Sequence, residues 1–168
     1  MAQVTLKSNP IHTNGDLPET NTKAQGFTLT SESLEEVTLE NFQGNKLILN
    51  IVPSIDTGIC AMSARKFNER ATAIGDAKVL TISKDLPFAM KRFCAAEGID
   101  DVVMLSDFRN SFGDDYGVLL VDGPMKGLLA RSIVVLNSKH EVVYTELVPE
   151  IAQEPDYDKA INALENAD

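Results

Sequence analysis

The chain has 168 residues, of which 43% are hydrophobic, a composition typical of a globular protein with a sizeable core. No apolar run approaches the ~20 residues of a membrane-spanning helix, and the first residues lack the apolar segment of a signal peptide. Its 25 acidic and 15 basic residues give a net charge of −10, which argues against binding to nucleic acid. We therefore expect one cytoplasmic domain over residues 1–168, with neither a membrane nor a nucleic acid as partner.

Residues 1–44 are expected to form an amino-terminal extension with modest strand content. Short strands are expected around residues 4–6, 11, 27–30 and 36–39. The first two flank Ser8-Asn9-Pro10, and Thr13-Asn14-Gly15-Asp16 is typical of a turn. The segment 41–45 predicts a further turn, which leads into the central part of the chain.

From residue 46 onward, strand and helix patterns alternate. Apolar runs predict buried strands at 46–52, 78–83 and 102–106. Helical patterns are found at 60–74, from Pro87 to Gly98 and at 110–116. The chain ends with strands at 131–136 and 141–144, which 137–140 joins as a hairpin, and with an amphipathic helix at 156–167.

This order of elements restricts the fold. Strands separated by helices require right-handed crossovers and a parallel arrangement, whereas the hairpin adds antiparallel strands to the same sheet. We therefore predict an α/β, thioredoxin-like fold, in which helices flank a central mixed sheet and an amino-terminal β extension precedes it.

The segment between the first central strand and its helix carries a cysteine in an unusual position. Pro53 ends the ladder pairing of the strand, and Cys60 falls in the first turn of the helix that follows. Unpaired backbone N–H groups and the helix dipole favour an anion there, and the thiolate is the nucleophilic form of cysteine. The alternative is a small apolar residue that packs at a helix start.

Pro53, Thr57 and Cys60 fit the pattern P-x-x-x-T-x-x-C, with a strand before it and a helix after it. Here the chain resembles the peroxiredoxins. The segments that look like the thiol peroxidase subfamily, whose members are atypical 2-Cys peroxiredoxins, are 53–57, 65–68, 83–89, 92–99 and 127–131. The likeness covers essentially the whole chain.

The resemblance implies a role for each residue of the motif. Cys60 would be the peroxidatic residue, whose thiolate attacks a peroxide O–O bond and becomes a sulfenic acid. Thr57 would bond the sulfur and the peroxide, Arg131 would supply a fixed positive charge, and Pro53 would shield the cysteine from water. Taken singly, Thr57 is more often a helix cap, Pro53 a strand stop and Arg131 a surface or salt-bridge residue, and it is their joint spacing with Cys60 that favours the catalytic roles.

Cys94 on its own could be a cysteine buried in a helix. The resemblance instead implies a resolving thiol, which would condense with the Cys60 sulfenic acid into an intramolecular disulfide that closes a loop of about 35 residues. The reduced and oxidised forms are expected to differ, and if the two Cα atoms start further apart than the ~7 Å that bonded cysteines need, the helix starts must locally unwind. The chain has no C-x-x-C of its own, so the resemblance implies an external dithiol, thioredoxin, as reductant.

Other features complete the expectations. The two cysteines, His12 and His140 lack the spacing of metal ligands, so no metal, haem or flavin cofactor is expected, and both histidines are expected in solvent-facing turns. Gly58 stands where thiol peroxidases commonly carry proline, which predicts easier unwinding around Cys60.

The resulting hypothesis is a thioredoxin-dependent peroxidase that acts on hydrogen peroxide and organic hydroperoxides. Relatives imply a homodimer and an apolar mouth suited to alkyl hydroperoxides. Two alternatives stay open. General thiol–disulfide exchange would show as insulin-disulfide reduction without peroxide, and a non-enzymatic redox sensor or binding module, switched by the same disulfide, would react slowly with peroxide.

Overall fold

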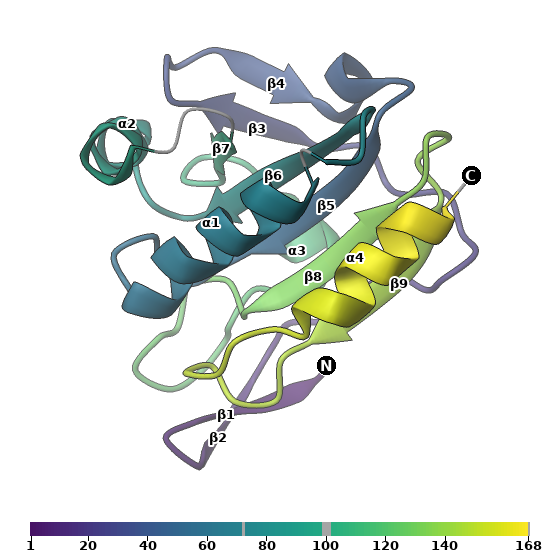
Figure 1. Cartoon of the computed structure of the whole chain (residues 1–168). Helices are drawn as coiled ribbons and strands as arrows, with labels where there is room; N and C mark the ends of the chain where they lie inside the picture. The colour runs from purple at the N-terminus through teal and green to yellow at the C-terminus, as the bar shows by residue number, and fades with distance from the viewer. Residues whose placement is uncertain (72, 99–101, 168) are drawn as a thin grey trace.

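The computed structural model describes residues 1–71, 73–98 and 102–167 (Figure 1). The strands are β1 (Gln3–Leu6), β2 (Asn9–His12), β3 (Thr28–Ser31), β4 (Glu36–Thr38), β5 (Lys46–Ile51), β6 (Ala77–Ser83), β7 (Val103–Ser106), β8 (Ser132–Leu136) and β9 (Val142–Leu147). The helices are the 3-10 helix η1 (Leu39–Phe42) and the α-helices α1 (Gly58–Ala71), α2 (Pro87–Glu97), α3 (Phe112–Asp115) and α4 (Tyr157–Asn166).

Seven strands form one mixed sheet in the order β4-β3-β7-β6-β5-β8-β9. The three central strands β5, β6 and β7 are parallel, and β8 runs antiparallel to β5. β1 and β2 pair with each other in a separate antiparallel hairpin. The predicted α/β arrangement, with a mixed sheet flanked by helices and a β structure at the amino terminus, is confirmed.

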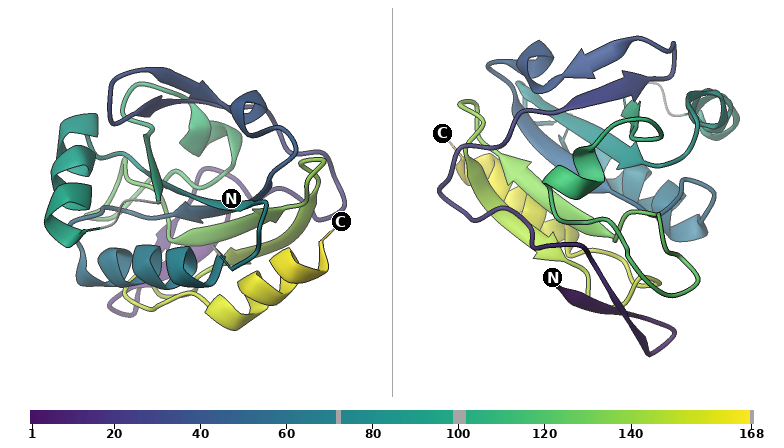
Figure 2. Two further views of the ribbon diagram at one scale, coloured as in Figure 1. Left: turned by 45° about the horizontal axis from the view of Figure 1, so that its top comes forward. Right: turned by 180° about the vertical axis from the view of Figure 1, so that it is seen from behind.

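Helices cover both faces of the sheet. α1 and α4 lie side by side on one face, and α3 lies on the other (Figure 2). The two faces of β5 show the two-residue period of a strand: Leu47 and Leu49 join the core cluster that contains Phe112 of α3, whereas Ile48 joins the cluster that contains Phe67 of α1. Each of these β5 side chains is fully buried, so β5 is the centre of the core.

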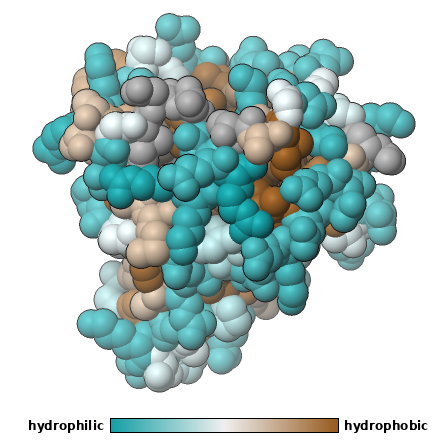
Figure 3. Space-filling model, viewed as in Figure 1, coloured by the Kyte–Doolittle hydropathy of each residue, from teal (hydrophilic) through white to brown (hydrophobic). Residues whose placement is uncertain are grey.

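A third cluster lies beyond the carboxyl end of β5. It contains Val52 and Cys60 together with Met90 of α2, and Cys94 packs against it. This cluster is what brings the helices of the two cysteines together. Figure 3 shows that the surface over α1 and α4 is mainly hydrophilic, with small apolar areas, which fits the net charge of −10.

Helix α2 follows its predicted signals closely. Pro87 occupies the first turn, and Gly98 adopts a left-handed conformation (φ 65°) whose N–H donates to the carbonyl of Cys94. Helix α1 was predicted to reach residue 74, and this was wrong, because residues 73–76 form turns. The N–H of Ile74 bonds back to the carbonyl of Ala71, which directs the chain into β6.

Two amino-terminal expectations also need correction. The turn of the first hairpin is Lys7-Ser8, both with positive φ, rather than Ser8-Asn9-Pro10. A two-residue turn with this geometry matches the twist of the strands, and Pro10 lies within β2. Strands β3 and β4, which fall in residues 1–44, belong to the main sheet. Within the described ranges, no helix has both the length and the apolar character needed to cross a bilayer.

Glu150 attaches the β1–β2 hairpin to the segment after β9. Its carboxylate accepts hydrogen bonds from the N–H of Ala152 and the N–H of Ser8, each at 3.0 Å, and from the hydroxyl of Thr5. These bonds favour the charged form and lower the pKa of Glu150 to about 2. The hairpin is therefore held by an ionised carboxylate.

The Glu150 pKa predicts a specific loss of stability in acid. Because the folded-state pKa is lowered, this stabilisation is fully present above the ordinary value of 4.5 and is lost as pH falls toward about 2. We expect Glu150→Gln to reduce the dependence of the unfolding free energy on pH in that window. Urea unfolding followed by circular dichroism measures it, with Glu36→Gln, an exposed residue of β4, as the control. An unchanged pH profile would contradict the assignment.

Candidate active site

The chain delivers Cys60 to the carboxyl end of the central strand. β5 ends at Ile51, Pro53 is buried in the bend that follows, and α1 begins at Gly58. Cys60 is the third residue of that helix, so its predicted place in the first turn is confirmed. Its backbone N–H bonds to the carbonyl of Thr57 at 3.1 Å.

Two polar side chains converge on the Cys60 sulfur. The hydroxyl of Thr57 lies 2.7 Å from Sγ, and a guanidinium nitrogen of Arg131 lies 3.2 Å from it. Both groups can donate, and both therefore favour a sulfur that carries negative charge. The family resemblance associated these three residues, and the structure brings them into direct contact.

Arg131 is buried, with an exposed fraction of 2%. A guanidinium stays charged at all physiological pH values, and a buried charge is costly unless it is paired. Its Nε donates to the carbonyl of Ile151 at 2.7 Å, but it takes part in none of the carboxylate ion pairs found within the described ranges. Its burial and its contact with the Cys60 sulfur disfavour the reading of Arg131 as a surface residue.

A mainly apolar cavity of about 480 Å³ opens beside these residues. Its lining consists of Leu6, Thr57, Gly58, Ile59, Met62, Met125, Arg131, Ile151 and Ala152. Cys60 itself is only 1% exposed. Thr57 and Arg131 both line the cavity and both contact the sulfur, so these two groups connect the cavity with Cys60. The lining agrees with the expected apolar mouth.

The remaining motif residues are placed less directly. Pro53 is buried, but its contact with the sulfur stays a prediction. Cys94 lies near the end of α2, is half-buried and packs on the cluster that contains Cys60. The two cysteines are not bonded to each other in the structure, and the predicted disulfide stays a prediction.

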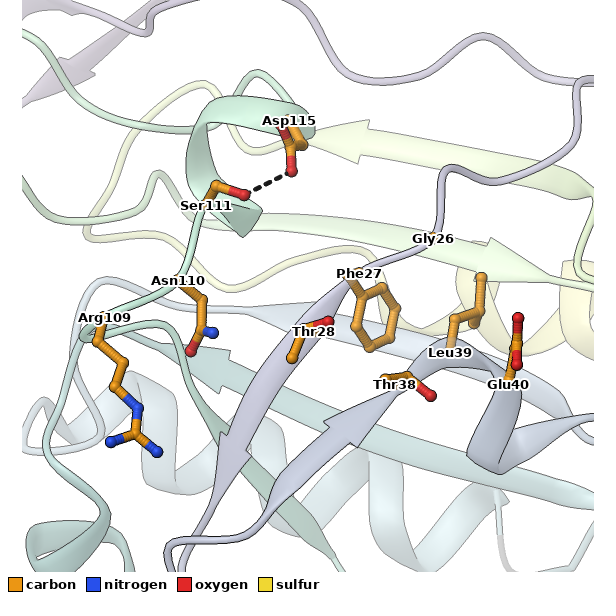
Figure 4. Close-up of a pocket in the computed structure, with 10 residues that line it drawn as sticks. All are labelled: Gly26, Phe27, Thr28, Thr38, Leu39, Glu40, Arg109, Asn110, Ser111 and Asp115. Atoms are coloured by element: carbon orange, nitrogen blue, oxygen red, sulfur yellow. Dashed lines mark hydrogen bonds between the residues drawn. The ribbon is translucent and has the colours of Figure 1, made fainter.

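A larger cavity, of about 740 Å³, lies elsewhere, between β3, η1 and the segment before α3 (Figure 4). Phe27 and Leu39 face it together with the polar side chains of Arg109, Asn110 and Glu40. Neither cysteine is among its lining residues. Its volume alone does not make it the site, because the candidate catalytic residues Thr57 and Arg131 line the smaller cavity.

Both histidines were predicted to face solvent in turns. His140 does lie in the 137–140 connection, where its N–H donates to the carbonyl of Asn137, but its predicted exposure and the predicted turn at His12 were wrong. His140 is 7% exposed, and its Nε2 lies 3.0 Å from the carbonyl oxygen of Phe42. His12 belongs to β2, is half-buried, and its Nδ1 lies 2.7 Å from the carboxylate of Asp122. Among the described residues, no group of three His, Cys, Asp or Glu side chains could hold a metal ion.

A tyrosine lies behind the site, where α4 meets α1. The Tyr157 ring packs edge-on against the Phe67 ring, with 5.0 Å between the ring centroids, and the Tyr157 hydroxyl donates to Glu154. Burial, together with the bond to Glu154, raises the pKa of Tyr157. The phenol therefore stays neutral and does not compete with the sulfur for the charge of Arg131.

Sequence reasoning missed the polar contacts that hold the segment before α1. The carboxylate of Asp85 accepts from the Ser54 hydroxyl at 2.9 Å and from the Ile55 N–H at 2.8 Å. The sequence did carry a signal for this contact. The predicted parallel strands end just before residues 53–55 and around residues 83–85, and the carboxyl ends of parallel strands meet at one edge of a sheet.

Thioredoxin-like proteins with a reactive cysteine at a helix start form the class to which this arrangement points. Comparison with known proteins identifies the family of the chain within this class. The Redoxin family model matches residues 19–161. The thiol peroxidase of Mycobacterium tuberculosis is 57% identical over 98% of this chain and 99% of its own length, and that of Corynebacterium glutamicum is 51% identical over the same shares.

A solved structure, a peroxiredoxin-like protein from Aquifex aeolicus, is 35% identical and superposes with a TM-score of 0.92 over 98% of this chain and 96% of that one. The chain therefore belongs to the Redoxin family, and within it to the thiol peroxidases, which are peroxiredoxin enzymes.

Replacement of Arg131 tests the charge beside the sulfur. We expect Arg131→Met to slow the reaction of Cys60 with peroxide by about 10²-fold, the usual cost of removing one preorganised donor. Arg131→Lys should recover only part of the rate, because lysine cannot reproduce the two-point contact with the sulfur and Ile151. Stopped-flow peroxide kinetics measure both. Arg109→Met, at the other cavity, is the control, and equal effects in the two Met variants would refute the assignment.

Gly58 offers a second test. It is exposed, it opens α1, and a Cβ added there would meet nothing within 4 Å. Proline is compatible with a first helical position, so Gly58→Pro should stabilise the fold by about 0.5–1 kcal/mol through the unfolded chain and slow any step that unwinds this turn. Thermal unfolding and peroxide rate constants, with Gly58→Ala as the matched variant, check this. Unchanged kinetics would discard the role given to Gly58 in unwinding.

Proposed function

We propose that the protein reduces hydrogen peroxide and organic hydroperoxides through Cys60. The Cys60 thiolate attacks one peroxide oxygen, the O–O bond breaks, and the departing oxygen takes a proton and leaves as water or an alcohol. Cys60 is thereby oxidised to a sulfenic acid. The Cys94 sulfur then attacks Cys60, the sulfenic oxygen leaves as water, and an intramolecular disulfide forms.

The observation that carries this proposal is the contact of the Cys60 sulfur with Thr57 and Arg131 at the base of the apolar cavity. A cation and a hydroxyl at one buried sulfur serve two purposes. They favour the thiolate before the reaction, and they can donate to the peroxide oxygens as charge moves from sulfur to the departing oxygen. Pro53, buried in the preceding bend, would help to exclude water.

The cavity supports a preference for organic hydroperoxides over hydrogen peroxide. Its walls include Met62, Met125 and Ile151, with Thr57 and Arg131 as its polar groups. An alkyl chain would bury apolar surface against these walls, while the hydroperoxide group lies at the polar end. Hydrogen peroxide would use the polar end only.

Regeneration requires a dithiol from outside the chain, because the chain contains two cysteines in all and no C-x-x-C. We propose thioredoxin as that reductant, in keeping with the family resemblance. The same resemblance supports a homodimer, and we also propose a cytoplasmic location. The hydrogen bonds from Thr5 and Ser8 to Glu150 support one domain over residues 1–168.

Two substitutions separate the proposed steps. Cys60→Ser should abolish peroxide consumption, because serine is not a comparable nucleophile. Cys94→Ser should react once with peroxide and then stop, because no disulfide can form for the reductant to open. Stopped-flow assays with thioredoxin, its reductase and NADPH measure turnover, and a single-turnover assay without them measures the first step. Loss of the first turnover in both variants would contradict the assigned roles.

Two measurements distinguish the alternatives, an insulin-reduction assay without peroxide and the turnover assay with thioredoxin. A thiol–disulfide exchanger would reduce insulin without peroxide. A redox sensor would form the disulfide slowly and show no sustained turnover with thioredoxin. The arrangement of Arg131 and Thr57 around the sulfur favours the peroxidase, because a cation fixed beside a thiolate serves fast attack on a peroxide.

A further inference from the structure

The carboxylate of Asp85 joins the two segments from which the cysteine-bearing helices begin. Asp85 lies between β6 and α2, two residues before Pro87. Its Oδ1 accepts from the hydroxyl of Ser54 at 2.9 Å, and its Oδ2 accepts from the N–H of Ile55 at 2.8 Å. Both partners lie in the segment between β5 and α1, so the carboxylate spans two neighbouring strand ends.

These contacts are not those of an ordinary turn residue. An aspartate in a turn accepts from the backbone two residues further along, whereas the partners of Asp85 precede it by 31 and 30 positions. The next residue back, Lys84, places its ammonium 3.2 Å from Asp107. Asp85 takes part in none of the ion pairs found in the described part of the chain, so its acceptor capacity is directed to neutral donors.

Asp85 is itself held in place. The hydroxyl of Ser83 donates to its Oδ2 at 2.6 Å, and its own N–H donates to Ser83 at 3.2 Å. The hydroxyl of Ser106, at the end of β7, donates to its carbonyl. β5, β6 and β7 are adjacent parallel strands, with β6 in the middle (Figure 1). Asp85, which follows β6, is therefore bonded both to the segment after β5 and to the end of β7.

The contact continues from Asp85 to the sulfur through Ser54. The carbonyl of Ser54 accepts from the N–H of Thr57 at 3.4 Å and lies 3.2 Å from the Thr57 hydroxyl. That hydroxyl is the one 2.7 Å from the Cys60 sulfur. A shift of Ser54 therefore moves the group that donates to the sulfur, and displacements of about 1 Å are enough to cost large factors in rate.

We propose that Asp85 is a positioning residue for the attack of Cys60 on peroxide. It fixes Ser54, and through Ser54 the Thr57 hydroxyl, relative to the segment that begins the Cys94 helix. This inference rests on the proposed function, because it takes Cys60, Thr57 and Cys94 in the roles given above.

Removal of the carboxylate should affect the two steps of the reaction differently. In Asp85→Ala, sulfenic acid formation should slow by about tenfold, because the Thr57 hydroxyl loses its fixed place. Closure of the disulfide should not slow, because that step needs the segment before α1 to loosen. Rapid mixing with peroxide, acid quenching and mass spectrometry separate the sulfenic acid from the disulfide and give both rate constants.

Further variants give the test its controls. Asp85→Asn should recover most of the first rate constant, because the amide oxygen can accept from Ile55 while its NH₂ donates to the Ser54 oxygen. Ser54→Ala, which removes one of the two bonds, should fall between wild type and Asp85→Ala. Asp156→Ala removes the carboxylate that caps α4 by accepting from Lys159, and it controls for a general loss of stability.

Three outcomes would overturn the inference. These are a first rate constant in Asp85→Ala within about twofold of wild type, an equal slowing in Asp156→Ala, or no recovery in Asp85→Asn. Failure of the proposed function looks different, because wild-type protein itself would then form no sulfenic acid, and the positioning role would fall with it.

Discussion

The contact between the Arg131 guanidinium and the Cys60 sulfur is the interaction on which the site depends. It joins a permanent cation that is 2% exposed to a sulfur that is 1% exposed, and the buried charge of Arg131 would be costly without polar partners. Backbone pairing sets this contact. Because Ile51 at the end of β5 pairs with Ser132 at the start of β8, the residue before β8 lies beside the helix that follows β5.

The parallel arrangement of β5, β6 and β7 gathers the other parts of the site. Their carboxyl ends lie at one edge of the sheet, so the segment before α1, the segment before α2 and the residues after β7 are neighbours. Each segment has a polar tie to the next, from Ser54 to Asp85 and from Lys84 to Asp107. Burial raises the pKa of Asp107, although its bonds from Gly113 and Lys84 oppose the shift.

The same helix start meets two opposing demands in the proposed cycle. Attack on peroxide needs the sulfur, the Thr57 hydroxyl and the guanidinium in fixed positions, whereas the expected difference between the reduced and disulfide forms would require the helix starts to unwind. Side-chain and carbonyl hydrogen bonds hold the segment before α1, while a Cβ added at Gly58, the first residue of the helix, would meet no atom within 4 Å. A segment fixed by hydrogen bonds and a helix start that can unwind can thus be adjacent in the chain.

Local patterns in the sequence determined the order of strands and helices, the position of Cys60 in the first turn of α1, and the limits of α2 at Pro87 and Gly98, because periodicity, caps and breakers act over a few residues. The motif resemblance associated Thr57 and Arg131 with the cysteine before any distance was known. Only the tertiary structure decided where α1 ends, that His140 is buried, that Ile151 holds Arg131 and that Asp85 binds Ser54. Each of these depends on residues brought together by sheet register and packing, which a linear pattern does not encode.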